Sequence, residues 1–202
     1  MGRKSLKEER QQEIVEAFYK VARKNGLANA SIAKVADHLG INPSLVLHYF
    51  NTRDELFGGL IRYILEKYSG IYKATERGIA NESELLLLID NLFSRKWNDL
   101  FDDGVFYSCY AMVYQDKNIR RSFRLLHDSL RNMLVEALGE ARRNNVLEIE
   151  SEQDTADVIF ALVEGAYYYL GMVSNKAVYA QKLKLLRNQA LIILNLPVPA
   201  EV

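Results

Sequence analysis

The sequence predicts an all-α protein in which a small N-terminal helical domain, residues 1–51, is joined to a larger helical domain, residues 52–202. Apolar residues recur at intervals of three and four along most of the chain, which is the period of a helix with one buried face. Only three residues are proline, at positions 43, 197 and 199, so the long span between them lacks this helix breaker. Hydrophobic residues make up 49% of the chain, which is enough for a sizeable core.

The first helix is expected to begin after Ser5. Ser5 and Glu8 have the Ser-x-x-Glu spacing of a capping box, in which each side chain accepts a hydrogen bond from the other residue's backbone amide. Gly26 is the expected end of this helix, because glycine tolerates the backbone conformation that follows a last helical turn. A buried stripe is expected between them, at helical spacing, from Ile14, Phe18, Val21 and Ala22.

The next segment predicts two short helices joined by a tight glycine turn. Ser31 is the expected cap of the first helix and Gly40 its end, since a sharp reversal needs a residue that accepts a positive φ. Asn42 and Pro43 then form a cap and first-turn pair for the second helix. Two short helices in this arrangement are the layout of a helix-turn-helix DNA reader.

A three-helix bundle with no role in DNA binding is the alternative to this interpretation. Val46 and Phe50 are four residues apart and are expected to face inward. Leu45 and Leu47 are expected to lie exposed on a short polar helix, where two leucines indicate a surface that meets a partner. The DNA-reading interpretation is therefore favoured.

A long fourth helix is expected after Thr52, because Thr52 and Glu55 repeat the capping-box spacing. The segment from Asp102 to Gly104 is expected to form a turn farther along the chain. Apolar periodicity predicts the remaining helices at about residues 85–101, 106–114, 119–143, 151–174 and 177–195.

A family resemblance is carried by the residues of the two short helices and the start of the fourth. The segments are Ala33-Lys34-Val35-Ala36 through Leu39-Gly40-Ile41-Asn42, then His48-Tyr49-Phe50-Asn51-Thr52-Arg53-Asp54-Glu55-Leu56. They resemble the DNA-binding domain of the TetR family of transcriptional repressors. The ending His48-Tyr49-Phe50, together with the C-terminal part, more narrowly resembles the choline-responsive BetI-like branch.

The resemblance implies a homodimer whose first three helices bind double-stranded DNA. The rest of the chain is then a helical ligand-binding and dimerisation domain. The implied function is a ligand-responsive, sequence-specific transcriptional regulator, a repressor released from an inverted-repeat operator by a small-molecule effector. The sequence does not identify that effector. A helical protein-interaction module without DNA binding is the alternative.

The family's base-reading positions fall at the start of the third helix, and its phosphate-contacting positions fall mostly at the end of that helix. The resemblance assigns base reading to Asn42, Pro43, Ser44 and Leu45, and phosphate contact to Ser31, Leu47, His48, Tyr49 and Arg53. Asn42 and Ser44 suit base edges, and Leu45 suits a thymine methyl group. Leu47 departs from the family, many of whose members have an aromatic hydroxyl there. Because leucine cannot donate to a phosphate, the operator cannot be transferred from relatives. Packing or solvation is the alternative role for His48.

The last two predicted helices are apolar on more than one face. In residues 151–174 one side holds Ile159, Leu162, Ala166 and Leu170, and the other holds Val158, Ala161, Gly165, Tyr168 and Met172. In residues 177–195, Leu185 and Ile192 lie off the main stripe, which holds Leu183, Leu186, Ala190, Ile193 and Leu194. A helix that is apolar all round needs cover on all sides, so we expect a homodimer through a seam of four helices, two from each chain. Burial within one chain is the alternative.

Aromatic residues are frequent in the middle of the chain, and 12 of the 202 residues are tyrosine. Tyrosine combines an apolar ring with a polar tip, which suits a ligand cavity, and several aromatic rings around an acid can hold a quaternary ammonium group. Ordinary core packing is the alternative for each of them. The candidate ligand-binding residues are Trp97, Phe101, Tyr107, Tyr110, Tyr114, Glu164, Tyr167 and Tyr168.

Other function classes have little support in the sequence. Cys109 is the only cysteine, which excludes an intrachain disulfide and a thiolate zinc cluster. The chain has three histidines in unrelated segments and no metalloprotease, phosphate-loop, serine-hydrolase or dinucleotide-binding motif, so no enzyme, cofactor or metal site is expected. No apolar run approaches the ~20 residues that span a bilayer, and the start is polar and basic, so a cytoplasmic protein is expected.

The net charge is zero, but the two signs are not evenly distributed. Lys and Arg outnumber Asp and Glu by 12 to 8 in residues 1–75, and are outnumbered by 14 to 18 in residues 76–202. The excess of positive charge near the N-terminus agrees with a surface that faces phosphates.

Overall fold

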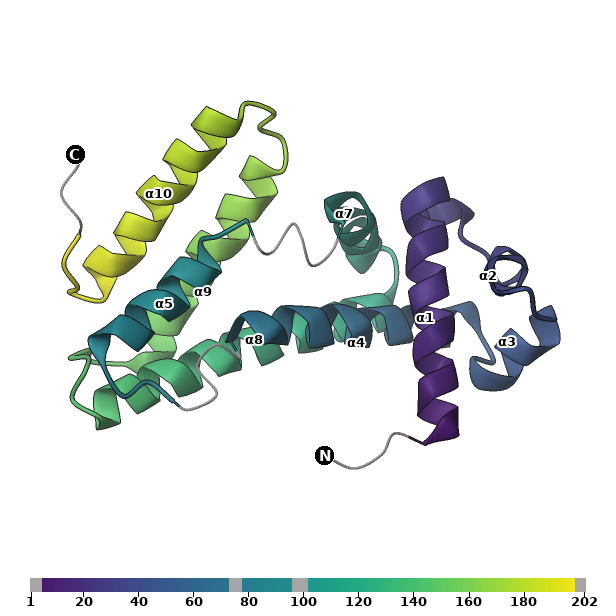
Figure 1. Cartoon of the computed structure of the whole chain (residues 1–202), viewed down its shortest axis with the longest axis horizontal. Coiled ribbons are helices and arrows are strands. Elements are labelled where there is room, and N and C mark those ends of the chain that lie inside the picture. The colour runs from purple at the N-terminus through teal and green to yellow at the C-terminus, as the bar shows by residue number, and fades with distance from the viewer. Residues whose placement is uncertain (1–4, 73–77, 96–101, 199–202) are drawn as a thin grey trace. The chain divides into compact units, whose positions relative to one another are not determined.

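The computed structural model describes residues 5–72, 78–95 and 102–198, with the side chains of residues 69–72 left out (Figure 1). These ranges contain helices and no strand, which confirms the all-α prediction. In order, the elements are α1 (Leu6–Asn25), η1 (Leu27–Asn29), α2 (Ile32–Leu39), α3 (Pro43–Tyr49), α4 (Arg53–Tyr72), α5 (Glu82–Leu92), α7 (Asp103–Ala111), η3 (Met112–Tyr114), α8 (Lys117–Arg143), α9 (Glu152–Leu170) and α10 (Lys176–Ile193).

The chain separates into two compact units. The first comprises Met1–Lys67 and Leu100–His127, and the second comprises Tyr68–Asp99 and Asp128–Val202. Two of the boundaries between them fall inside α4 and α8. The expected division after residue 51 concerns which residues bind DNA, and it stays a prediction about function.

Local capping bonds start the helices where the sequence predicts. At α1, Glu8 N donates to Ser5 Oγ at 3.3 Å and Ser5 N donates to Glu8 Oε2 at 2.9 Å, which completes the expected capping box. At α4, Glu55 N donates to Thr52 Oγ1 at 3.1 Å as predicted, but the Glu55 carboxylate accepts from Asn51 N at 2.9 Å instead of from Thr52 N. The capping-box prediction is therefore confirmed at α1 and only half confirmed at α4.

The first unit builds its core where α1, α2 and α3 pack together. Phe18, Val35, Val46 and Phe50 are buried there, as the apolar spacing predicts. Gly40 ends α2 in the left-handed conformation, with φ +64°, and its backbone amide donates back to Ala36 and Asp37. This turn aims α3 away from α2, and it supplies the predicted helix-turn-helix geometry.

The second unit packs α10 against both α5 and α9. Leu88, Ile159 and Leu191 are fully buried in its core. The Tyr167 hydroxyl lies 2.8 Å from the Leu92 carbonyl oxygen and 2.7 Å from that of Ser94, so its proton is directed at the end of α5.

Three predicted boundaries differ from the structure. The helix expected over residues 85–101 ends at Leu92, and the part of that prediction over residues 96–101 lies outside the described ranges. The turn expected at Asp102 to Gly104 is instead the start of α7: the Asp102 carboxylate accepts from Val105 N at 3.0 Å, which caps the helix. Helix α9 ends at Leu170 rather than near residue 174.

Within the described ranges, no helix has both the length and the apolar composition that crossing a bilayer requires.

Candidate DNA-binding and effector sites

The start of α3 carries the residues expected to read bases, and it is exposed. Asn42 is the N-cap: its Oδ1 accepts from Ser44 N at 3.0 Å and from the Ser44 hydroxyl at 2.9 Å. Pro43 occupies the first turn, where its missing amide proton costs nothing. The side chains of Asn42 and Ser44 are thus already oriented toward each other in the free protein.

The two leucines of α3 do not behave alike. Leu47 is 42% exposed, as predicted. Leu45 is half-buried, so the expectation that both would be exposed is wrong for Leu45.

The end of α3 is held by a contact that the sequence did not predict. Gln11 on α1 donates from Nε2 to the Tyr49 carbonyl oxygen at 3.3 Å. The Tyr49 ring lies edge-on to the ring of His48, with 5.1 Å between their centroids. His48 is exposed and Tyr49 is half-buried, so both side chains reach the surface beside this anchored carbonyl.

Arg53 and Ser31, two expected phosphate contacts, each have an intramolecular role. Arg53 donates from Nη2 to the Leu27 carbonyl oxygen at 3.1 Å, which ties the start of α4 to η1. A guanidinium group has five N–H donors, so others remain for a phosphate. The Ser31 hydroxyl oxygen accepts from Lys34 N at 3.3 Å as the cap of α2, and its proton can still be donated.

Part of the expected ligand-binding set forms an aromatic cluster in the first unit. Tyr110 lies 6.0 Å from Phe123 and 6.3 Å from Tyr114 between ring centroids, and Tyr107 lies 5.4 Å from Phe106. Tyr110 is 37% exposed and Tyr114 is 73% exposed. The cluster therefore combines a packed interior with open tyrosine rings.

The remaining expected ligand-binding residues lie on α9 in the second unit or outside the described ranges. Glu164 is half-buried and Tyr168 is 60% exposed, while the hydroxyl of Tyr167 is directed at the carbonyls that follow α5. Trp97 and Phe101 lie outside the described residues. The ligand-binding set as a whole stays a prediction.

Cys109 is fully buried on α7, and burial raises the pKa of its thiol to about 12. The thiol is therefore protonated at neutral pH and is a poor nucleophile and a poor metal ligand. Among the residues that the structure describes, no group of three or more His, Cys, Asp and Glu side chains is placed to hold a metal ion.

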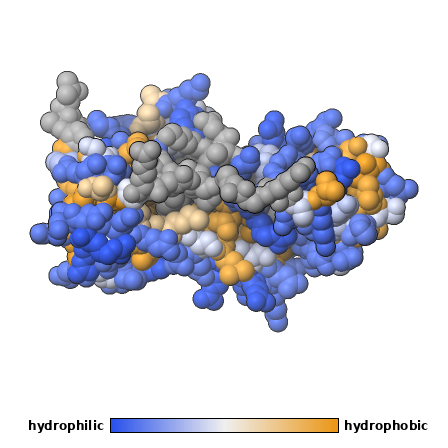
Figure 2. Space-filling model, turned by 60° about the horizontal axis from the view of Figure 1, so that its bottom comes forward, coloured by the Kyte–Doolittle hydropathy of each residue, from blue (hydrophilic) through white to orange (hydrophobic). Residues whose placement is uncertain are grey.

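Several large apolar side chains are exposed on α9 and α10. Figure 2 shows apolar patches on a largely hydrophilic face of the molecule. We define the seam face as the exposed residues Val158, Ala161, Gly165 and Tyr168 on α9, with Val178, Leu185 and Ile192 on α10. On each helix one predicted stripe is covered within the chain and the other is exposed. The covered stripes comprise the buried residues Ile159, Ala166, Leu170, Leu183, Ala190 and Leu194 and the half-buried residues Leu162, Leu186 and Ile193. Met172, expected on the exposed stripe, is 66% exposed but lies beyond the end of α9. The partner that covers the seam face stays a prediction.

Two family models match the chain. Residues 14–60 match the bacterial regulatory proteins of the tetR family, and residues 80–196 match the tetracyclin repressor-like C-terminal domain. The HTH-type transcriptional regulator PksA of Bacillus subtilis (strain 168) is 22% identical over 160 residues, which cover 78% of this chain and 77% of PksA. The HTH-type transcriptional regulator BetI of Brucella suis biovar 1 (strain 1330) is 24% identical over 144 residues, covering 69% of this chain and 73% of BetI.

The fold agrees with these matches. The crystal structure of a TetR transcription regulator from Haloarcula marismortui ATCC 43049 is similar to this chain, with a TM-score of 0.77 at 20% identity, covering 93% of this chain and 97% of that one. The family consists of DNA-binding transcriptional regulators and not of enzymes. With a family model spanning 117 residues from 80 to 196, and a helix-turn-helix domain before it, the chain belongs to the TetR family of transcriptional regulators.

Proposed function

We propose that this regulator is a ligand-responsive repressor that binds an inverted-repeat operator as a homodimer and leaves it when a small molecule binds. The observation that carries the proposal is the exposed start of α3, where Asn42 and Ser44 present polar atoms while Val46 anchors the helix in the core. A short helix exposed in this way fits the major groove, where polar side chains meet base edges.

Phosphate contacts fix the register of such a helix on the duplex. We assign them to Ser31, His48, Tyr49 and Arg53, whose exposed or half-exposed side chains carry donors. Leu47 has no donor and is assigned to apolar contact with sugar or methyl groups. Because the operator lies on the chromosome, we expect the protein to act in the cytoplasm.

The proposed dimer pairs the seam faces of two chains. Val158, Tyr168, Leu185 and Ile192 are each at least half exposed, in the range 50% to 60%, which is unusual for large apolar side chains on neighbouring helices. Pairing two such faces gives the seam of four helices that the sequence analysis expects, and it relates the two copies of α3 by a two-fold axis.

Two contacts within the first unit support a route for the proposed ligand response. The Tyr19 hydroxyl on α1 accepts from the backbone amide of Asp102, the cap of α7, at 3.0 Å. The Tyr19 ring lies 6.0 Å from the ring of Tyr63 on α4, between centroids. A ligand at the aromatic cluster of α7 would therefore displace a helix that is bonded to α1 of the reading domain. The ligand must bind the released state more tightly, by typically ~1 to 3 kcal/mol.

The experiment that tests the proposal is fluorescence anisotropy of the protein on DNA that flanks its own gene, compared with scrambled DNA over a salt series. Preferential, salt-sensitive binding to an inverted repeat is the expected result. Salt-sensitive binding without preference would mean that the operator lies elsewhere. Absence of binding at low salt to either DNA would reject the reading-domain assignment and favour the interaction-module alternative.

Tyr49 provides the first variant pair. Tyr49→Ala is expected to weaken operator binding at least about fivefold while the dimer stays intact, because a phosphate donor and the ring beside His48 are both lost. Tyr49→Phe keeps the ring and removes only the hydroxyl, so it measures how much the hydroxyl contributes to operator affinity. Unchanged operator affinity in Tyr49→Ala, measured by the same anisotropy assay, would remove Tyr49 from the site.

A further inference from the structure

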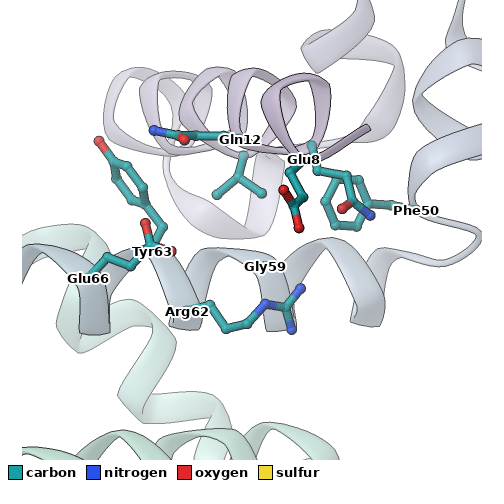
Figure 3. A pocket seen from close by; sticks show the side chains of 9 residues that line it. Glu8, Gln12, Phe50, Gly59, Arg62, Tyr63 and Glu66 are labelled. Atoms are coloured by element: carbon teal, nitrogen blue, oxygen red, sulfur yellow. The ribbon is translucent and has the colours of Figure 1, made fainter. Parts of the chain in front are cut away.

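A crevice between α1 and α4 in the first unit has a lining that neither DNA reading nor the aromatic cluster uses (Figure 3). Its volume is about 330 Å³, within the range of small-molecule sites. One wall is a face of α1 and the other is a face of α4, with the ring of Phe50 beside them. The lining residues are Glu8, Gln11, Gln12, Val15, Phe50, Gly59, Arg62, Tyr63 and Glu66.

The floor of the crevice is apolar because Gly59 lets the two helices approach closely. A Cβ atom at position 59 would lie 2.8 Å from Val15 Cγ2 and 3.1 Å from Phe50 Cε1. Val15 and Phe50 are themselves buried. Val15, Phe50 and Gly59 therefore give the crevice a tightly packed apolar floor.

The walls of the crevice carry charges of both signs. Figure 3 shows the Glu8 side chain reaching down from α1 and the Arg62 side chain lying along α4 near Gly59. One oxygen of Glu8 accepts from Ser5 N at 2.9 Å, and Glu66 adds a second carboxylate from α4. Arg62 has neither a hydrogen bond nor an ion pair with any residue that the structure describes.

We infer that this crevice binds a small zwitterion with an apolar side chain, the chemistry of a free amino acid. The ligand's carboxylate pairs with the Arg62 guanidinium, and its ammonium group lies against the carboxylates of Glu8 and Glu66. Its side chain rests on Val15 and Phe50. A zwitterion can make the contact with Arg62 and the contact with the carboxylates at the same time, whereas a ligand with a single charge makes only one of them, so the zwitterion is the favoured class.

The crevice shares its walls with the supports of the recognition helix. Gln11, a lining residue, donates to the Tyr49 carbonyl oxygen at the end of α3, and Phe50 is the residue that follows α3. A ligand in the crevice thus touches the side chains that hold α3 in place. This site lies wholly in the first unit, and it is separate from the aromatic cluster of α7 in its residues.

The test is isothermal titration calorimetry of the full-length protein without DNA, using three matched probes. The first is L-phenylalanine, the second is 2-phenylethylamine, which lacks the carboxylate, and the third is 3-phenylpropionate, which lacks the ammonium group. We expect L-phenylalanine to bind and each analogue to bind at least about tenfold more weakly, because each loses one charge-assisted contact.

Variants that neutralise one charge in the crevice test whether L-phenylalanine binds there. Glu8→Gln and Arg62→Gln are each expected to weaken L-phenylalanine binding at least about fivefold. Glutamine at position 8 still completes a capping box, so α1 keeps its start. The matched controls are Glu9→Gln and Lys7→Gln, which change the same charges at exposed positions of α1 outside the crevice, and they are expected to bind as the unmodified protein does. Circular dichroism melting confirms that each variant is folded.

Three results would overturn the inference: no binding of L-phenylalanine at millimolar concentration, equal binding of either singly charged analogue, or binding that Glu8→Gln and Arg62→Gln leave unchanged. Operator binding of the ligand-free protein is measured separately by anisotropy. A failure of the amino-acid site therefore leaves the proposed repressor function standing, and a failure of operator binding leaves the calorimetric result interpretable.

Discussion

The exposed faces of α3 in the first unit and of α9 and α10 in the second differ in chemistry. At its start, α3 presents the amide of Asn42 and the hydroxyl of Ser44, while the seam face presents side chains such as Val158 and Leu185. Polar groups on a short helix suit base edges and phosphates, and a continuous apolar stripe suits another protein surface. The chemistry of an exposed stripe, more than its exposure, therefore indicates the class of partner.

A charge introduced in the seam face is the most disruptive test of this comparison. Leu185→Glu is expected to raise the dimer dissociation constant at least about 100-fold, roughly 3 kcal/mol, because an unpaired carboxylate would be buried between the two chains. Analytical ultracentrifugation measures the association. Leu87→Glu is the matched control, since Leu87 is 45% exposed on α5 outside the seam face. Equal association of the two variants would contradict the seam.

Because α1 and α4 approach closely at Gly59, a larger side chain there is expected to have the next largest effect, on the stability of the first unit. Gly59→Ala is expected to destabilise the protein by about 1 to 3 kcal/mol, because the new methyl group meets Val15 and Phe50 in a filled core. Thermal unfolding measures the effect. Gly58→Ala is the control: a Cβ atom there meets only Arg62 Nη1, at 3.7 Å, so the variant gains helix propensity without a clash. An unchanged melting temperature for Gly59→Ala would show that α1 and α4 can move apart enough to accept the methyl group.

A substitution at Gly165 tests whether a second copy of the chain covers this part of α9. Within the chain, a Cβ atom at Gly165 meets nothing within 4 Å, so Gly165→Ala alone should stabilise α9 by up to about 1 kcal/mol. If a second copy packs closely there, the added methyl group weakens the dimer. We expect weaker association, about fivefold by ultracentrifugation, together with higher helix stability. Unchanged association would place the close approach of the seam elsewhere on the two helices.

The smallest expected effect is at an ion pair of the second unit. Arg187 Nε and Asp90 Oδ1 are 2.5 Å apart, with the Arg187 side chain 20% exposed and the Asp90 side chain 50% exposed. A partly solvated pair contributes little, so Arg187→Ala is expected to cost about 0.5 kcal/mol in urea unfolding, and less at high salt. A double-mutant cycle with Asp90→Ala isolates the pair. A coupling energy above about 2 kcal/mol would mean that the pair is far better shielded than these exposures indicate.

Features set by residues within four positions of one another could be predicted from the sequence. The caps at Ser5, Ser31 and Asn42 each join residues two or three apart, and the buried stripes follow from helical spacing alone. Even here, a cap can compete with a turn assignment. The sequence predicts a turn at Asp102 because Asp and Gly are frequent in turns, but Asp is also frequent at helix N-caps. The hydrogen bond from Val105 N shows that Asp102 caps α7.

The contacts that hold the candidate sites together could not be predicted in the same way. Gln11 and Tyr49 are 38 residues apart, Arg53 and Leu27 are 26 apart, and Tyr19 and Asp102 are 83 apart. Each bond depends on how separate helices pack, which helical periodicity does not specify. The half-burial of Leu45 has the same origin. Aromatic abundance likewise predicted ligand-binding residues without indicating that some belong to the first unit and others to the second.

The cap of α3 has a consequence for base preference. The Ser44 hydroxyl donates its single proton to Asn42 Oδ1, so its oxygen is left as an acceptor. In the major groove the amino groups of adenine and cytosine are donors, whereas the guanine and thymine oxygens are acceptors. At the base that we propose it reads, a capped Ser44 is therefore expected to favour adenine or cytosine. Replacing Asn42 is expected to free the Ser44 proton and to relax that choice, so Asn42 would affect the base that Ser44 reads in addition to its own proposed contact with a base.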